Sequence, residues 1–341
     1  MSNDIQQQVF WEQQNRSFSE PTAACDLLHP ETRKTETDPA LTETQYFGFS
    51  VPEEHIHGMT YLWHHPNLGV VSGGVFAWRG VKRGPLEAEL FDMITFGSDD
   101  CLAGDLYDYT LPNGYHVTTL EPMRKHRLRY ADPSRGNALD ISYEAVMPAM
   151  VLGNGHHLEQ AMRTTGELTL AGKTYPLDGF SVRDRTWSEL RRDTLQPGAM
   201  PPIDWMTGAF GDDFCFGCTA QDNLDTNPDW KGVIEPSPGD PLKLGWVWRD
   251  GEMIPLVSSH KRSTRTPVSL FPETVDMVLT DAHGRTYEMK GTILAACPWY
   301  PWPTIEAVIC SVRWECEGRT AYGEVQRGLR PDYIRAFRSQ S

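Results

Sequence analysis

The chain has 341 residues, of which 39% are hydrophobic and 23% charged, and its 46 acidic residues outnumber 31 lysines and arginines to give a net charge of −15. This composition is typical of a globular protein, and its acidity argues against nucleic acid as a partner. No stretch approaches the ~20 apolar residues of a membrane span, and the first residues lack the apolar segment of a signal peptide. We therefore expect a cytoplasmic protein without membrane insertion.

The residue pattern predicts an all-β protein. Turn signals separate short runs of β-forming residues, and they fall at Asn113-Gly114, Ala171-Gly172, Asp250-Gly251, Asp281–Gly284 and Glu317-Gly318. Only residues 2–16 have a helical pattern, and residues 193–204 and 221–240 are expected to form long loops. A boundary near residue 175 would leave halves of ordinary domain size. We therefore expect an N-terminal extension over residues 1–20, followed by two barrel-like domains over residues 21–175 and 176–335.

Residues 53–65 contain the first candidate site. If this segment is a strand, one of its faces carries His57, Met59, Tyr61, Trp63 and His65. Such a mixture suits the wall of a ligand cavity, with His57 as a candidate for proton transfer and Tyr61 and Trp63 for substrate binding. An ordinary core or surface strand is one alternative. Chelation of a metal by His55 and His57 is another, but we expect no metal because further ligands are lacking.

The most informative run joins His156-His-Leu-Glu-Gln160, Gly166-Glu-Leu-Thr-Leu170 and Asp178-Gly-Phe-Ser-Val-Arg-Asp-Arg-Thr-Trp187. It resembles the superfamily of the carotenoid hydratases (hydroxyneurosporene synthases) and AttH-like proteins, most specifically at Gly179, Asp184 and Trp187. The resemblance implies two tandem lipocalin-like (calycin) β-barrels with an active site near their interface, lined by an Asp-His-Asn/Ser-Trp motif. Members include hydratases of terpenoid alkenes, a phytoalexin hydratase and cyclases, so the resemblance does not define one reaction.

Arg185 stands where this family has a histidine. In an extended strand, Arg183, Arg185 and Trp187 share one face, and Asp184 lies on the other. Arginine cannot exchange a proton near neutral pH, so Arg185 would bind a carbonyl, carboxylate or enolate, or hold a neighbouring acid. The flanking arginines favour an ionised Asp184. We expect Asp184 and Arg185 to be catalytic and Arg183 and Trp187 to bind substrate, with a structural ion pair of Arg183 and Asp184 as the alternative.

Two further candidates lie downstream. The resemblance implies a second acidic residue on the strand after the motif, and Asp222 is the positional match for this catalytic group. A solvated loop aspartate is the alternative. Trp246 shares a strand face with Trp248, and aromatic faces of this kind either pack a core or stabilise a carbocation in a substrate cavity.

These observations predict an enzyme, a lyase or an isomerase. It would hydrate, dehydrate or isomerise a hydrophobic unsaturated, terpenoid-like molecule by acid–base chemistry in a cavity at the domain junction. No glycine-rich phosphate loop is present in the sequence, and we expect no cofactor. A cyclase of the same fold and a non-catalytic carrier of a lipophile are the alternatives. The small-molecule substrate is the expected partner, and a homodimer is compatible with the sequence.

Overall fold

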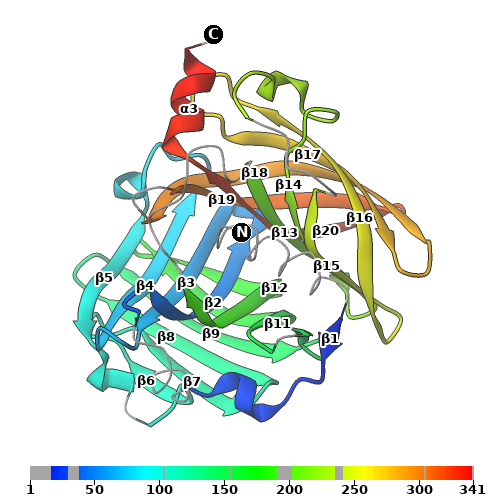
Figure 1. Cartoon of the computed structure of the whole chain (residues 1–341). Coiled ribbons are helices and arrows are strands. Elements are labelled where there is room, and N and C mark those ends of the chain that lie inside the picture. The colour runs from blue at the N-terminus through cyan, green and yellow to red at the C-terminus, as the bar shows by residue number, and fades with distance from the viewer. Residues whose placement is uncertain are drawn as a thin grey trace. The chain divides into compact units, whose positions relative to one another are not determined.

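The computed structural model describes residues 17–29, 38–102, 104–153, 155–190, 202–234, 241–302 and 305–339. These residues form two compact units. The N-terminal unit comprises Phe18–Arg79 and Leu86–Arg192, and the C-terminal unit joins Gly80–Pro85 to the chain from Asp193 onward. Strands make up nearly all of the regular structure, so the predicted all-β class is confirmed (Figure 1). The helical pattern at residues 2–16 lies outside the described residues.

The N-terminal unit is a 12-stranded sheet that curls around its own core (Figure 1). Its main path runs in the order β5-β4-β3-β2-β12-β11-β9-β8-β7-β6, and β1 and β10 pair beside β11. The strands are β1 (Phe18–Ser19), β2 (Leu41–Val51), β3 (Ile56–His65), β4 (Val70–Arg79), β5 (Leu90–Ser98), β6 (Asp108–Thr110), β7 (His116–Glu121), β8 (Lys125–Asp132), β9 (Asn137–Ala145), β10 (Met150–Leu152), β11 (His157–Leu170) and β12 (Lys173–Leu190). Short 3-10 helices connect them, namely η1 (Ala23–Asp26), η2 (Pro52–Glu54), η3 (Pro85–Glu87) and η4 (Asp99–Leu102). The predicted boundary near residue 175 falls within β12, which pairs with β11 and β2.

Side chains connect the two ends of this curled sheet. Tyr130 on β8 donates its hydroxyl to Asp92 Oδ2 on β5 at 2.6 Å. Asn113, in the turn between β6 and β7, donates Nδ2 to the Asp92 carbonyl at 2.8 Å, and Asn137 donates to the Glu89 carbonyl at 3.1 Å. In the part of the chain that the structure describes, no backbone ladder joins β5 to β6. The sheet is therefore closed by side-chain hydrogen bonds across its seam.

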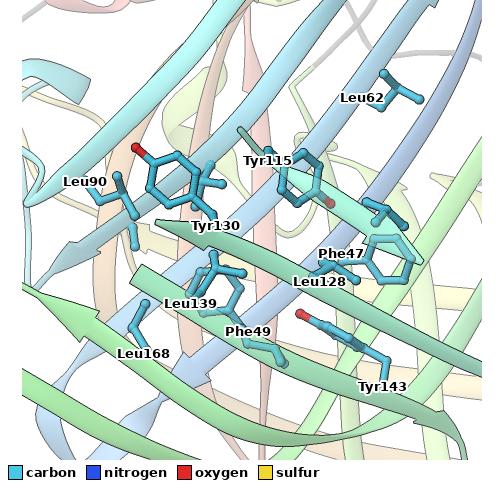
Figure 2. Packing of buried hydrophobic residues seen from close by; sticks show 14 of the residues in the cluster. Phe47, Phe49, Leu62, Leu90, Tyr115, Leu128, Tyr130, Leu139, Tyr143 and Leu168 are labelled. Atoms are coloured by element: carbon cyan, nitrogen blue, oxygen red, sulfur yellow. The ribbon is translucent and has the colours of Figure 1, made fainter. Parts of the chain in front are cut away.

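Alternate residues of these strands fill the inside of the curl, as Figure 2 shows for side chains from β2, β3, β5, β8, β9 and β11. Phe47 and Phe49 of β2 are both 0% exposed. The hydroxyl of Tyr143 in this core has a hydrogen-bond partner, since it donates to the Gly48 carbonyl at 2.8 Å. We name the side of the sheet that carries this core the inner face, and the opposite side the outer face.

The C-terminal unit is a closed barrel in which eight strands follow one another in chain order (Figure 1). The strands are β13 (Ile203–Gly211), β14 (Phe214–Gln221), β15 (Leu242–Arg249), β16 (Glu252–Arg265), β17 (Pro272–Asp281), β18 (Thr286–Trp302), β19 (Ile305–Cys316) and β20 (Arg319–Leu329). The helices are η5 (Pro228–Trp230) and α3 (Pro331–Arg338). Gly80–Pro85 belongs to this unit because Lys82 N donates to the Ala296 carbonyl of β18 at 2.8 Å. In the described part of the chain, no helix is long and apolar enough to cross a membrane.

Two-residue turns connect strands of this barrel at predicted positions. Asp250 and Gly251 have φ values of 53° and 90°, and Glu317 and Gly318 have values of 52° and 74°. Two successive residues with positive φ match the twist of the flanking strands, which explains the glycine at the second position. The two predicted turns are therefore confirmed.

Candidate functional site

Strand β12 divides the motif identified in the sequence between the two faces of the N-terminal sheet. Opposite β2, Arg183 pairs with Phe47 and therefore lies on the inner face, and Arg185 lies on the same face two residues later. Both arginines are 0% exposed. Asp184 pairs with Tyr46 and faces outward. The predicted alternation of the arginines and Asp184 is confirmed, and it places them on opposite sides of the sheet.

Arg185 binds a segment of the same chain. We name residues 22–29 the strap. Arg185 donates Nη1 to the carbonyl of Cys25 at 2.6 Å and Nη2 to the carbonyl of Leu27 at 3.1 Å. A second Nη2 contact reaches Glu43 Oε2 on β2 at 3.4 Å. The guanidinium thus has carbonyl and carboxylate acceptors of the type predicted for it, and the chain itself provides them.

Arg183 forms an ion pair with Asp26 of the strap. Its Nη1 donates to Asp26 Oδ1 at 2.6 Å, and its Nε donates to Gln160 Oε1 at 2.8 Å. Burial alone would raise the pKa of Asp26, but the charge and hydrogen bond of Arg183, together with the neighbouring basic groups, outweigh burial and lower the pKa to about 2. Asp26 therefore stays ionised at neutral pH and paired with Arg183.

Trp187 completes the contacts with the strap. Its ring stacks on His29 with 4.4 Å between the ring centroids and 3° between the planes. The guanidinium of Arg185 lies 5.7 Å from the centroid of the Trp187 ring. The backbone N of His29 also donates to Glu43 Oε1 at 2.9 Å. Together, Arg183, Arg185 and Trp187 hold the strap against the inner face.

We therefore expect Arg185→Met to destabilise the protein by about 3–5 kcal/mol, because the change leaves the Glu43 carboxylate buried without its cation. Turnover per folded molecule should stay unchanged. Thermal melting and activity on one preparation measure both quantities. Arg163→Met is the matched control, since Arg163 pairs with Asp178 at side-chain exposures of 41% and 69%, and loss of such a surface pair costs less than ~1 kcal/mol. Full stability with slow turnover would contradict the clamping role.

Asp184 lies on the outer face beside acidic and aromatic side chains. The ladders place Asp184 opposite Glu159 of β11 and Tyr46 of β2, and they place Tyr46 opposite Tyr61 of β3. Side chains opposite one another in an antiparallel pair have Cβ atoms ~4.5–5.5 Å apart. We name the resulting group the outer-face cluster, and it comprises Tyr46, Tyr61, Trp63, His157, Glu159, Asp184 and Thr186.

His157 is the group in this cluster best suited to hold a proton. Its Nδ1 lies 2.8 Å from Thr186 Oγ1, and its Nε2 lies 3.3 Å from Glu159 Oε1. Burial opposes the charged imidazolium, but the hydrogen bond and charge of Glu159, together with the charge of Asp184, outweigh burial and raise the pKa of His157. Neither His157 nor Glu159 was predicted from the sequence as a site residue. The feature of the sequence that could have identified them is a histidine and a glutamate two residues apart, because this spacing puts both side chains on one face of β11.

The aromatic part of the cluster consists of Tyr46, Tyr61 and Trp63. The rings of Tyr46 and Tyr61 meet edge to face with centroids 6.2 Å apart, and those of Tyr61 and Trp63 do so at 6.4 Å. Tyr61 and Trp63 are partly exposed, whereas Tyr46 is 2% exposed. The predicted common face of Tyr61, Trp63 and His57 is confirmed by the register of β3 with β2.

His57 lies on the outer face but far along it from Asp184. The two residues are two strands and four residues apart in the ladder, which corresponds to about 17 Å. His57 packs edge to face on Trp78, with 5.2 Å between the ring centroids, and burial lowers its pKa to about 3. His55 precedes β3 with a φ of 52°. No group of three or more metal-ligating side chains occurs among the described residues.

Asp222 is buried in an ion cluster inside the C-terminal barrel. Arg327 donates to Asp222 and, at 3.3 Å, to Asp204, and Lys261 Nζ lies 2.7 Å from Asp222 Oδ1. Trp230 donates Nε1 to Asp222 Oδ2 at 2.7 Å. Burial opposes ionisation, but Arg327 and Lys261 outweigh it and hold the pKa of Asp222 well below its ordinary value. Asp222 is thus neither a solvated loop residue nor a holder of a proton at neutral pH.

Trp246 also belongs to the C-terminal unit. It lies on β15 opposite Gly217, on the face away from the apolar core of the barrel, and it is 0% exposed. The structure therefore brings together Asp184, Tyr61 and Trp63 on the outer face of the N-terminal sheet. Arg183, Arg185 and Trp187 lie on the opposite face.

The outer face of the N-terminal sheet also has a hollow of about 520 Å³. Its lining comes from β6, β7, β8, β9 and β11 and includes His116, Arg129, Asp140, Glu167 and Thr169. None of the nine predicted site residues lines this hollow.

Solved structures share this architecture. Kievitone hydratase from Nectria haematococca is 12% identical with a TM-score of 0.52, over 94% of this chain and 98% of its own. CghA is 8% identical with a TM-score of 0.50, over 86% and 88%. An AttH-like protein from Nitrosomonas europaea is 14% identical with a TM-score of 0.48, over 84% and 92%. The first two likenesses confirm the tandem lipocalin-like fold that the sequence resemblance implied.

The family is shown by sequence. A family model described as "Domain of unknown function (DUF7064)" matches residues 26–327, and the chain belongs to this family. No curated protein has a significant sequence match to this chain.

Proposed function

We propose that this protein is an enzyme that adds water to, or removes water from, a hydrophobic unsaturated small molecule without a cofactor. The observation that carries the proposal is the outer-face cluster, where His157, with its raised pKa, lies beside Asp184 and the rings of Tyr46 and Tyr61. The fold shared with a hydratase supports it.

In the direction of hydration, protonated His157 gives its proton to one carbon of the double bond and becomes neutral. The other carbon becomes cationic, and the faces of Tyr46 and Tyr61 stabilise that charge. Water forms the new carbon–oxygen bond, and Asp184 accepts the proton that this water loses. Dehydration is the same sequence in reverse. If Asp184 removes a carbon-bound proton instead, the double bond moves and the product is an isomer.

His57 has a different role in this proposal. At about 17 Å from Asp184 it cannot act on the same bond, and with its pKa lowered to about 3 it is not the imidazolium acid at neutral pH. We assign His57, Tyr61 and Trp63 to the surface that binds the apolar part of the substrate. Arg183, Arg185 and Trp187 are assigned to the strap and not to the substrate.

The proposal is tested by incubating the protein with unsaturated terpenoid and phenolic compounds, kievitone among them, in isotopically labelled water. Mass spectrometry should find a product that has gained one water carrying the label. A product of unchanged mass with carbon-bound deuterium from heavy water would indicate isomerisation. Saturable binding of these compounds without any product would contradict the proposal and favour a carrier. Ring closure that persists in a His157→Gln variant would favour a cyclase.

A further inference from the structure

The inner face of the N-terminal sheet becomes polar beneath the strap. Gln45 of β2 lies opposite Arg185 of β12, and the two side chains are 2% and 0% exposed. Gln45 Oε1 accepts the hydroxyl of Tyr109 at 2.7 Å, which orients the amide. Arg185 directs its Nη atoms to the strap carbonyls. The positions of both side chains are therefore set by bonds to other parts of the chain.

Two nitrogen donors in this arrangement have no hydrogen-bond acceptor among the described residues. They are Gln45 Nε2 and Arg185 Nε, and both atoms are buried. A buried donor without an acceptor has lost its water and gained nothing in exchange, so native proteins rarely contain one. Residues opposite one another in a ladder have Cβ atoms ~4.5–5.5 Å apart. An acceptor atom bound between the two side chains would satisfy both donors.

We propose that Gln45 and Arg185 form an internal binding site for one neutral oxygen atom that the chain does not supply. This oxygen belongs to a buried water, or to the carbonyl or hydroxyl group of a small ligand enclosed beneath the strap. The site is independent of the outer-face cluster.

The charges around the site favour a neutral guest. Arg183 is balanced by Asp26 and Arg185 by Glu43, at 2.6 Å and 3.4 Å. His126 lies 3.9 Å from Asp26, and burial and the charge of Arg183 lower its pKa to about 3, so it is neutral. A carboxylate or phosphate would bring an uncompensated charge into this buried region, which is strongly unfavourable. A hydroxyl, carbonyl or water oxygen satisfies both donors without that penalty.

A crystal structure of the full chain at high resolution tests the site directly. We expect electron density for an oxygen atom within hydrogen-bond distance of both Gln45 Nε2 and Arg185 Nε. Mass spectrometry of the compounds released on denaturing the same preparation separates the two sources. A compound released in stoichiometric amount identifies a ligand, and an isolated density peak with no released compound identifies water.

Two variants sharpen the test. Gln45→Met removes one of the two donors and should weaken the binding of the guest about ten-fold, which is seen as weaker density at the site. Gln326→Met is the matched control, because Gln326 lies on β20 of the C-terminal unit and its Nε2 donates to Glu324 Oε2 at 3.4 Å. The control should keep the guest. Wild-type density that shows Gln45 Nε2 bonded directly to a protein atom, or no density between the two donors, would overturn the proposal without recourse to either variant.

Discussion

Replacing His157 with glutamine is expected to slow turnover by ~10²–10⁴-fold, which is the contribution of a positioned proton donor. Glutamine can keep a hydrogen bond to Thr186 but carries no transferable proton. In the wild type, turnover in the hydration direction should fall as pH rises through the raised pKa of His157. The variant should lack this pH dependence. Asp184→Asn should lower turnover by a similar factor, because it removes the proposed base.

The control for this prediction is His116→Gln. His116 lies on β7, where its Nε2 is 2.8 Å from Asp108 Oδ1, and Asp108 is 70% exposed. It is not part of the outer-face cluster, so its variant should keep both the rate and the pH profile of the wild type. Wild-type turnover in a folded His157→Gln protein would remove His157 from the proposed mechanism.

The same histidine predicts how stability depends on pH. The pKa of His157 is higher in the folded protein than the ~6.5 of an unfolded chain. Its contribution to stability is therefore complete below ~6.5 and is lost as pH rises through the folded pKa. The difference in melting temperature between the wild type and His157→Gln should be largest in acid and shrink in alkali. A difference that grows with pH would contradict the raised pKa.

The second large effect is expected in the C-terminal barrel, where Arg327→Met should destabilise the protein by about 3–5 kcal/mol. Arg327 joins Asp204 and Asp222, and all three are at most 1% exposed. Its removal leaves Asp204 paired with Lys261 and leaves Asp222 paired with Lys261 and Arg265, whose Nη1 lies 3.3 Å from Asp222 Oδ2. That loss is a large fraction of the ~5–15 kcal/mol by which proteins are stable. Denaturant unfolding monitored by tryptophan fluorescence measures it.

Arg313→Met on β19 is the matched control, since Arg313 pairs with Glu315 at side-chain exposures of 44% and 53%. It should change stability by less than ~1 kcal/mol. The pKa of Asp222 is lowered on folding, so its contribution is present above the unfolded value of ~3.9 and is lost as pH falls toward the folded value. Without Arg327 the pKa of Asp222 rises, and acid unfolding should begin at a higher pH. An unchanged acid transition would contradict this account.

Structural features that depend only on residues close together in the sequence could be predicted from the sequence alone. The all-β class, the turns at Asp250-Gly251 and Glu317-Gly318 and the alternation of Arg183, Asp184 and Arg185 follow from backbone geometry that repeats every two residues or reverses at a glycine. The family resemblance of the motif added the tandem lipocalin-like fold. These properties need no knowledge of what lies opposite each strand.

The partners of those residues were decided by the tertiary structure. Alternation separates Arg185 from Asp184, but it cannot say that the strap covers one face and that His157 lies beside the other. Arg185 meets the carbonyl of Cys25 across 160 residues of sequence, and His157 meets Thr186 across 29. Such contacts depend on the register between strands and on the path of a distant segment, which local residue patterns do not encode. For the same reason Asp222, which looks like a loop residue in the sequence, is a buried carboxylate held by cations from β16 and β20.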